Sequence, residues 1–145
     1  MATQEQITLQ KLQDEMVQRA ERLVRDLNLS RDEGVEKGKT QASKALEVAQ
    51  TAGSLTVFIN WLRYQAGRES SALFWTKAAG KQTLARALTS ELNWLQSQVT
   101  SEMSQQSKAE QQQAVMRAVT RFLGYFRRAL IGARFLSEIS LEKGE

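Results

Sequence analysis

Arginine side chains recur along the segment from Ala114 to Leu136, AVMRAVTRFLGYFRRALIGARFL, at spacings of four and seven. At about 100° per residue, Arg117, Arg121 and Arg128 fall roughly opposite an apolar stripe on the same helix. That stripe consists of Val115, Val119, Phe122, Phe126, Leu130 and Ala133. Each guanidinium offers a planar fork of N–H donors that matches the oxygens of a phosphate. The segment therefore predicts contact with an anionic partner.

No acid accompanies these arginines within the segment, and Arg127 and Arg134 form a second row beside the first. On an ordinary surface helix, opposite charges four residues apart attract one another. One interpretation is that these arginines are solvated, or pair with acids of the first predicted helix such as Glu15 or Glu21. The other is that phosphates or an acidic protein surface neutralise them. The residues by themselves leave both interpretations open.

Aromatic and basic residues are interleaved in the middle of the chain. The stacking candidates are Trp61, Tyr64, Phe74 and Trp75, and the cations between and after them are Arg63, Arg68, Lys77 and Lys81. Proteins that bind single strands use this mixture, because bases stack on rings while cations hold phosphates. Rings at helical spacing also fill hydrophobic cores, which is the favoured interpretation for each ring. Phe74 and Trp75 are the expected exceptions, since an exposed pair on a short segment between Gly67 and Gly80 suits RNA or a protein partner.

Histidine and cysteine are both absent from the 145 residues, which removes the commonest general base, the commonest metal ligand and all thiolate chemistry. The sequence contains no phosphate-binding loop, zinc-protease motif or nucleophile elbow. The carboxylates Asp14–Glu15 and Asp32–Glu33–Glu36 lie on a mixed-charge helix and a linker, where solvated charge is the better interpretation. We therefore expect no catalysis, no cofactor, no metal and no small-molecule substrate.

Positive charge is concentrated in the middle and late parts of the chain. The net charge is +4 overall, but residues 54–134 hold eleven basic and four acidic side chains, which is a net charge of +7. Residues 1–53 hold eight basic and nine acidic side chains, which is a net charge of −1. This distribution favours an anionic partner for the later part of the chain.

Apolar periodicity and helix-capping residues predict a single-domain, all-α helical bundle over residues 1–145. Five main helices are expected at residues 4–27, 41–52, 54–67, 82–103 and 107–136, and one short helix at 70–80, with no strand. Thr3, Ser54 and Ser107 are suited to cap three of them. The helix at 54–67 is apolar on two sides and is expected to be central. Residues 28–39 are expected to form a flexible linker, and residues 137–145 a frayed tail.

No apolar run approaches the roughly 20 residues that a membrane span needs. The first residues, MATQEQITLQ, lack the charged start and apolar middle of a signal peptide. These two observations predict a cytoplasmic protein that has no membrane partner.

The chain resembles the small-subunit family of type III CRISPR effector complexes. Two segments carry the resemblance, AGSLTVFINWLRYQAGRE from residue 52 and QQAVMRAVTRFLGYFRRALIGARFL from residue 112. The first is an aromatic helix that ends in a basic turn, and the second is a late amphipathic helix with arginines outside. The order of helices and the length also fit, so that the resemblance spans most of the chain.

The resemblance implies a non-catalytic subunit of a ribonucleoprotein that takes part in antiviral defence. Copies of such subunits stack along the complex, face the duplex of guide and target RNA, and associate with the other protein subunits. Binding is through backbone charge, while base pairing supplies sequence selectivity. The alternative is a helical adaptor whose arginines dock on an acidic protein partner.

Overall fold

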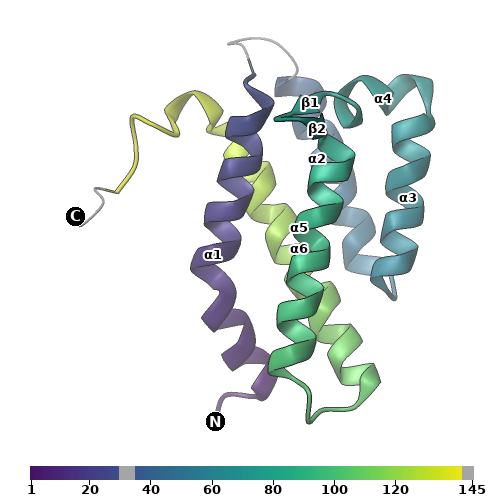
Figure 1. Cartoon of the computed structure of the whole chain (residues 1–145), viewed down its shortest axis with the longest axis vertical. Coiled ribbons are helices and arrows are strands. Elements are labelled where there is room, and N and C mark those ends of the chain that lie inside the picture. The colour runs from purple at the N-terminus through teal and green to yellow at the C-terminus, as the bar shows by residue number, and fades with distance from the viewer. Residues whose placement is uncertain (30–34, 142–145) are drawn as a thin grey trace.

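Six α-helices and a two-stranded hairpin form most of the computed structural model, which describes residues 1–29 and 35–141, the side chains of 35–37 excepted. The predicted all-α fold class is confirmed. In chain order, the elements are α1 (Gln4–Leu27), α2 (Val35–Thr51), α3 (Leu55–Gly67), α4 (Glu69–Trp75), β1 (Ala78–Ala79), β2 (Gln82–Thr83), α5 (Leu84–Glu102), α6 (Lys108–Ile131) and the 3₁₀ turn η1 (Ala133–Phe135), as Figure 1 shows. Within the described ranges, no helix is both long and apolar enough to cross a membrane.

Side-chain caps begin the helices at the positions that the sequence predicts. Thr3 and Gln6 form a reciprocal capping box at the start of α1. The Ser54 hydroxyl accepts a hydrogen bond from the backbone N–H of Val57, at 3.3 Å. The Ser107 hydroxyl accepts one from the N–H of Glu110, at 3.1 Å. Each cap satisfies a backbone donor that the first helical turn would otherwise leave unpaired.

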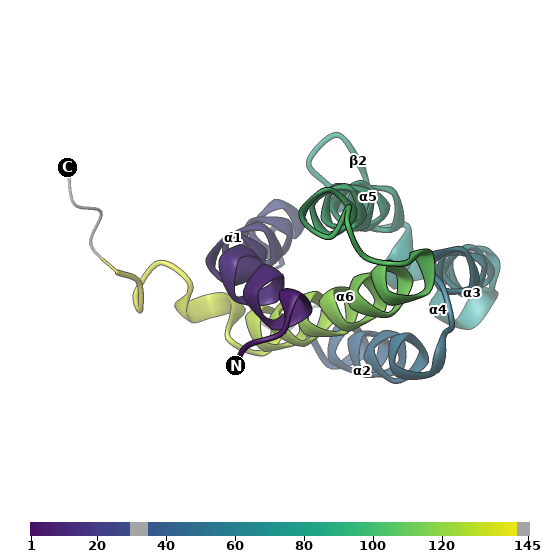
Figure 2. The same cartoon turned by 90° about the horizontal axis from the view of Figure 1, so that it is seen from below.

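Helix α6 lies at the centre of the bundle and packs against α1, α2 and α5 (Figure 2). Its predicted apolar stripe is buried as far as Leu130. The stripe joins apolar side chains from all the other helices in one hydrophobic core. Because three neighbours cover it, α6 keeps only a narrow exposed side, between α1 and α2.

Three boundaries differ from the sequence-based expectations by more than one helical turn. Helix α2 begins at Val35, so residues 35–39 of the expected linker are helical, and residues 30–34 lie outside the described part of the chain. The expectation of no strand is wrong, because a short hairpin replaces the end of the expected helix at 70–80, with Ala78 paired to Thr83 and a left-handed Gly80 at its tip. Helix α6 ends at Ile131, because the chain turns at Gly132 into η1. In the expected tail, residues 142–145 lie outside the described residues.

The expected central position of α3 is wrong. This helix lies at the edge of the bundle, away from α1 (Figures 1 and 2). It buries the face that contains Leu55, Phe58 and Leu62, whereas Val57 on its other face is 53% exposed. With 13 residues, α3 is long enough to cover one side of the core, and no element of the described chain lies on its outer side (Figure 2).

The expected exposure of Phe74 and Trp75 is also wrong. Their exposed fractions are 4% and 0%, because α4 turns both rings inward against α2. The Trp75 indole Nε1 donates a hydrogen bond to Oε1 of Gln41, at 2.9 Å. Phe74 lies so close to Gly38 that a methyl group on that glycine would be 2.8 Å from the ring. Both rings therefore belong to the core.

Replacing Gln41 by Met should lower the free energy of unfolding by about 1–3 kcal/mol, because the buried indole N–H of Trp75 loses its acceptor. Urea denaturation measures the change. Trp75→Phe removes the donor, so the Gln41→Met substitution should cost less in that background. Equal costs in the two backgrounds would contradict this role for the hydrogen bond.

Candidate nucleic-acid interface

Arg117, Arg121 and Arg128 are exposed together on the side of α6 that the neighbouring helices leave open. We call these three residues the arginine strip. The only acid of α6 is Glu110, two turns before Arg117, and no acid follows it on the helix, so no carboxylate lies between or after the members of the strip. A guanidinium is a hydrogen-bond donor that stays charged at any physiological pH. The strip can therefore bind anions but cannot exchange protons with a substrate.

Arg117 already has an acidic partner, which bears out part of the first interpretation of these arginines. Its Nη1 lies 2.5 Å from Oε1 of Glu5, at the start of α1. The expected partners were Glu15 and Glu21, but Glu15 pairs with Arg19. The Arg117 side chain is 58% exposed, and such surface ion pairs contribute only about 0–1 kcal/mol. A phosphate can therefore compete with Glu5 for this arginine.

Arg121 and Arg128 form no ion pair with any residue that the structure describes. The Arg128 guanidinium carbon lies 6.0 Å from the ring centroid of Tyr125, which is a loose cation–π contact. Two of the three members of the strip are thus charged, exposed and without a carboxylate partner in the described chain.

The second predicted row, Arg127 and Arg134, does not run beside the strip. Arg127 is half-buried on the side of α6 that faces α2, where its Nε donates to the Ser43 hydroxyl at 2.7 Å. Arg134 lies on η1, beyond the end of α6, with its guanidinium carbon 4.8 Å from the ring centroid of Phe135.

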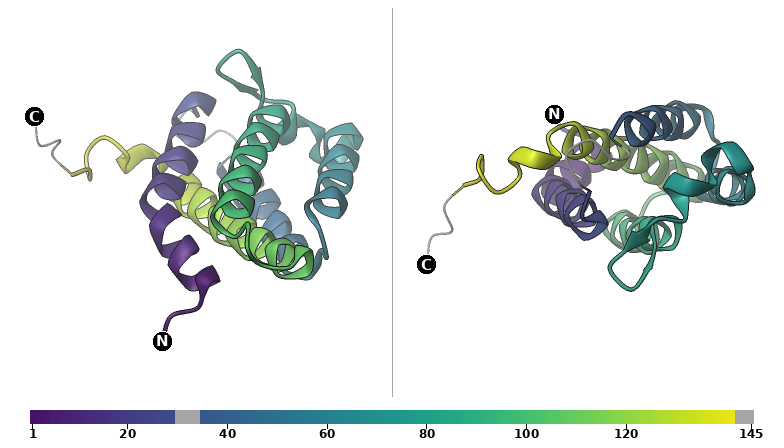
Figure 3. Two further views of the ribbon diagram at one scale, coloured as in Figure 1. Left: turned by 60° about the horizontal axis from the view of Figure 1, so that its bottom comes forward. Right: turned by 90° about the horizontal axis from the view of Figure 1, so that it is seen from above.

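The other predicted cations lie on other elements. Arg63 and Arg68 are on α3 and at the start of α4, whereas Lys77 and Lys81 are next to and within the hairpin. Figure 3 shows the hairpin and α2 on opposite sides of α6, with α3 far from α1. The structure therefore does not combine these four residues with the strip into one surface.

Of the predicted stacking residues, only Tyr64 is well exposed, at 61%. Its ring lies 5.8 Å from the guanidinium carbon of Arg68. Trp61 is half-buried and contacts Trp75 edge-on, with the ring centroids 6.3 Å apart. With Phe74 also buried, the four rings form no common stacking platform.

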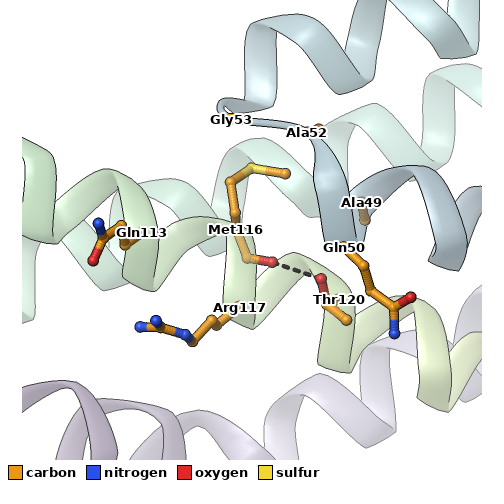
Figure 4. Close-up of a pocket in the computed structure, with 8 residues that line it drawn as sticks. All are labelled: Ala49, Gln50, Ala52, Gly53, Gln113, Met116, Arg117 and Thr120. Carbon is orange, nitrogen blue, oxygen red and sulfur yellow. Dashed lines mark hydrogen bonds between the residues drawn. The ribbon is translucent and has the colours of Figure 1, made fainter.

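A shallow groove of about 210 Å³ runs beside the first arginine of the strip, between α6 and the end of α2. Figure 4 shows Met116 extending from α6 toward Gly53, while Arg117 points away from α2. Gln50, Gln113 and Thr120 supply polar groups to the groove wall. Donors and acceptors of this kind suit the sugar and phosphate oxygens of a bound strand.

Arg19 is a charged residue whose role the sequence analysis missed. It donates to Glu15 at 2.9 Å and to Glu91 of α5 at 3.0 Å, and its guanidinium carbon lies 3.8 Å from the Trp94 ring centroid. Burial by itself would lower the pKa of Arg19, but the hydrogen bonds and charges of Glu91 and Glu15 raise it above the ordinary value. Arg19 therefore joins α1 to α5. The four-residue spacing from Glu15 was the only signal of this in the sequence.

Replacing Arg19 by Lys should lower the free energy of unfolding by about 1 kcal/mol, because an ammonium cannot both pair with two carboxylates and stack on Trp94. Urea denaturation measures the change. Arg22→Lys, at an exposed position on the same helix, is the matched control and should be neutral. An equal effect of the two substitutions would argue against the bridging role.

Comparisons with protein-family models, curated proteins and solved structures give no match to this chain.

Proposed function

We propose that this chain is a non-catalytic protein that binds the sugar–phosphate backbone of nucleic acid along the arginine strip. The observation that carries the proposal is the exposed, aligned set of Arg117, Arg121 and Arg128 on a helix that has no acid after Glu110. Cations in such a row release counterions from a polyanion, which provides affinity without sequence readout.

The length of the strip suits a run of phosphates. Arg117 and Arg128 are eleven positions apart, which is roughly 16 Å along a helix at 1.5 Å per residue. A strand of duplex DNA places one phosphate per about 3.4 Å of its axis, so the strip is as long as about five phosphates of such a strand. Arg121 and Arg128 can each bind a phosphate without breaking an ion pair. Arg117 can bind one after its ion pair with Glu5 is broken.

The resemblance to the small subunits of type III CRISPR effector complexes supports guide or target RNA as the ligand. In such a complex, other protein subunits and further copies of this chain are the partners, and the cytoplasm is the compartment. A strip that contacts phosphates only is consistent with a division of labour in which base pairing selects the target.

The alternative function is an adaptor that docks these arginines on an acidic protein. The exposed side chains of Val57, Tyr64 and Leu73 on α3 and α4 favour a protein contact, but they lie on another face of the bundle. An adaptor of this kind binds its protein partner and shows little affinity for RNA at low salt, so the following measurement separates the two functions.

Replacing Arg121 and Arg128 by Ala should weaken binding to a single-stranded RNA and reduce the slope of log affinity against log salt by about 1.4, which is about 0.7 for each lost phosphate contact. Fluorescence anisotropy over a salt series measures both quantities. The double variant Arg63→Ala/Arg86→Ala changes the net charge equally on other elements and should retain most of the slope. The strip is excluded as the site if the two double variants behave alike.

Replacing Glu5 by Gln should increase RNA affinity by up to about fivefold, because Arg117 then binds a phosphate without giving up an ion pair. The salt slope should increase by about 0.7 in the same titration. Glu69→Gln makes the same charge change in the first turn of α4 and serves as the control. No gain from Glu5→Gln beyond the control would show that Arg117 does not contact the strand.

A further inference from the structure

A second groove, of about 350 Å³, adjoins the strip at the end of α6. Its walls come from α1, the last two turns of α6 and the segment that follows α6. The residues used below are Val17, Glu21, Tyr125, Arg128, Phe135 and Ile139, which we call the aromatic groove. Its volume is at the lower end of the range of small-ligand sites.

The termination of α6 creates this groove. The N–H of Phe135 bonds to the carbonyl of Gly132, and the N–H of Ile139 bonds to the carbonyl of Phe135. The chain therefore turns after Ile131, and Phe135 and Ile139 line the groove together with Val17 of α1. A helix that continued to Leu136 would have no such turn.

Two aromatic rings line this groove, and cations lie beside both. Tyr125 is half-buried, and its hydroxyl accepts a hydrogen bond from Nε2 of Gln13 at 3.3 Å. Phe135 is exposed, with Arg134 over its ring. Aromatic rings beside arginines bind the bases of single strands, because a base stacks on the ring while the cation holds the neighbouring phosphate.

The charged residues that line the groove favour a base over a phosphate as its occupant. Arg128 is both a wall of this groove and the last member of the strip, so a strand that follows the strip reaches the groove. Glu21 lines the groove and disfavours a phosphate inside it, and Val17 and Ile139 supply apolar surface. A nucleobase is a flat, uncharged ring, which suits the apolar walls and the nearby carboxylate of Glu21. The phosphates attached to it can remain on the strip, next to Arg128.

We infer that the aromatic groove binds one unpaired nucleobase of the strand whose phosphates lie on the strip. The inference rests on the proposed function and adds to it that the preferred ligand is single-stranded. A base-paired strand cannot place a base in the groove, because its bases remain stacked inside the duplex.

The test compares single-stranded oligouridine RNA with a duplex RNA of the same length, bound to the full chain in the same salt series. The wild-type protein should bind the single strand more tightly. Phe135→Leu keeps apolar bulk but removes the ring, and should weaken single-strand binding about tenfold, with the salt slope and the duplex affinity unchanged. Tyr64→Leu removes an exposed ring beside a cation on α3 and should change neither affinity.

A second variant reports on stacking directly. Phe135→Trp keeps a ring at this position, so oligouridine should bind at least as tightly and quench the added indole fluorescence, whereas the duplex should not. Unchanged single-strand affinity in Phe135→Leu, or an equal loss for the duplex, would overturn the base site and leave the proposed function standing. A wild-type protein that binds neither RNA would overturn both.

Discussion

Burial of the apolar stripe of α6 is the constraint on which the rest of the structure depends. Helices α1, α2 and α5 cover this stripe, and the core that results includes apolar side chains from every other helix. A guanidinium cannot enter such a core without a counter-charge. Arg117, Arg121 and Arg128 therefore lie on the side that the neighbours leave open, whereas Arg127, at the edge that faces α2, is only half-buried. The packing that stabilises the bundle also forms its cationic surface.

Residues of the neighbouring helices α1 and α2 then determine how many of the α6 arginines remain unpaired. Glu5 of α1 partly neutralises Arg117, and Ser43 of α2 holds Arg127 by a hydrogen bond. Glu15 lies on another side of α1, where it pairs with Arg19, which also pairs with Glu91 of α5. The N-terminal third has a small net negative charge, yet among its described residues only Glu5 of α1 forms an ion pair with the strip. The strip consequently stays positive beside it.

The end of α6 joins two kinds of surface. The strip presents charge alone, which is suited to the phosphates of a nucleic acid of any sequence. Beyond Ile131 the turn at Gly132 brings aromatic and apolar side chains next to Arg128, the last member of the strip. The proposed binding by backbone charge and ring stacking requires neither proton transfer nor a metal, which agrees with a sequence that has no histidine or cysteine.

The sequence by itself determined the features that depend on contacts within a few turns of helix. It specified both ends of α1, the caps at Ser54 and Ser107 and the buried stripe of α6, because capping and periodicity are local. It also specified that Arg117, Arg121 and Arg128 share one side of α6. Only the tertiary structure decided which element approaches each side. It paired Arg117 with Glu5, 112 residues away, and turned Phe74 and Trp75 into the core against α2. It also moved α3 to the edge and placed the aromatic groove beside the strip. These outcomes depend on contacts between residues that are distant in the chain, and local spacing carries no information about them.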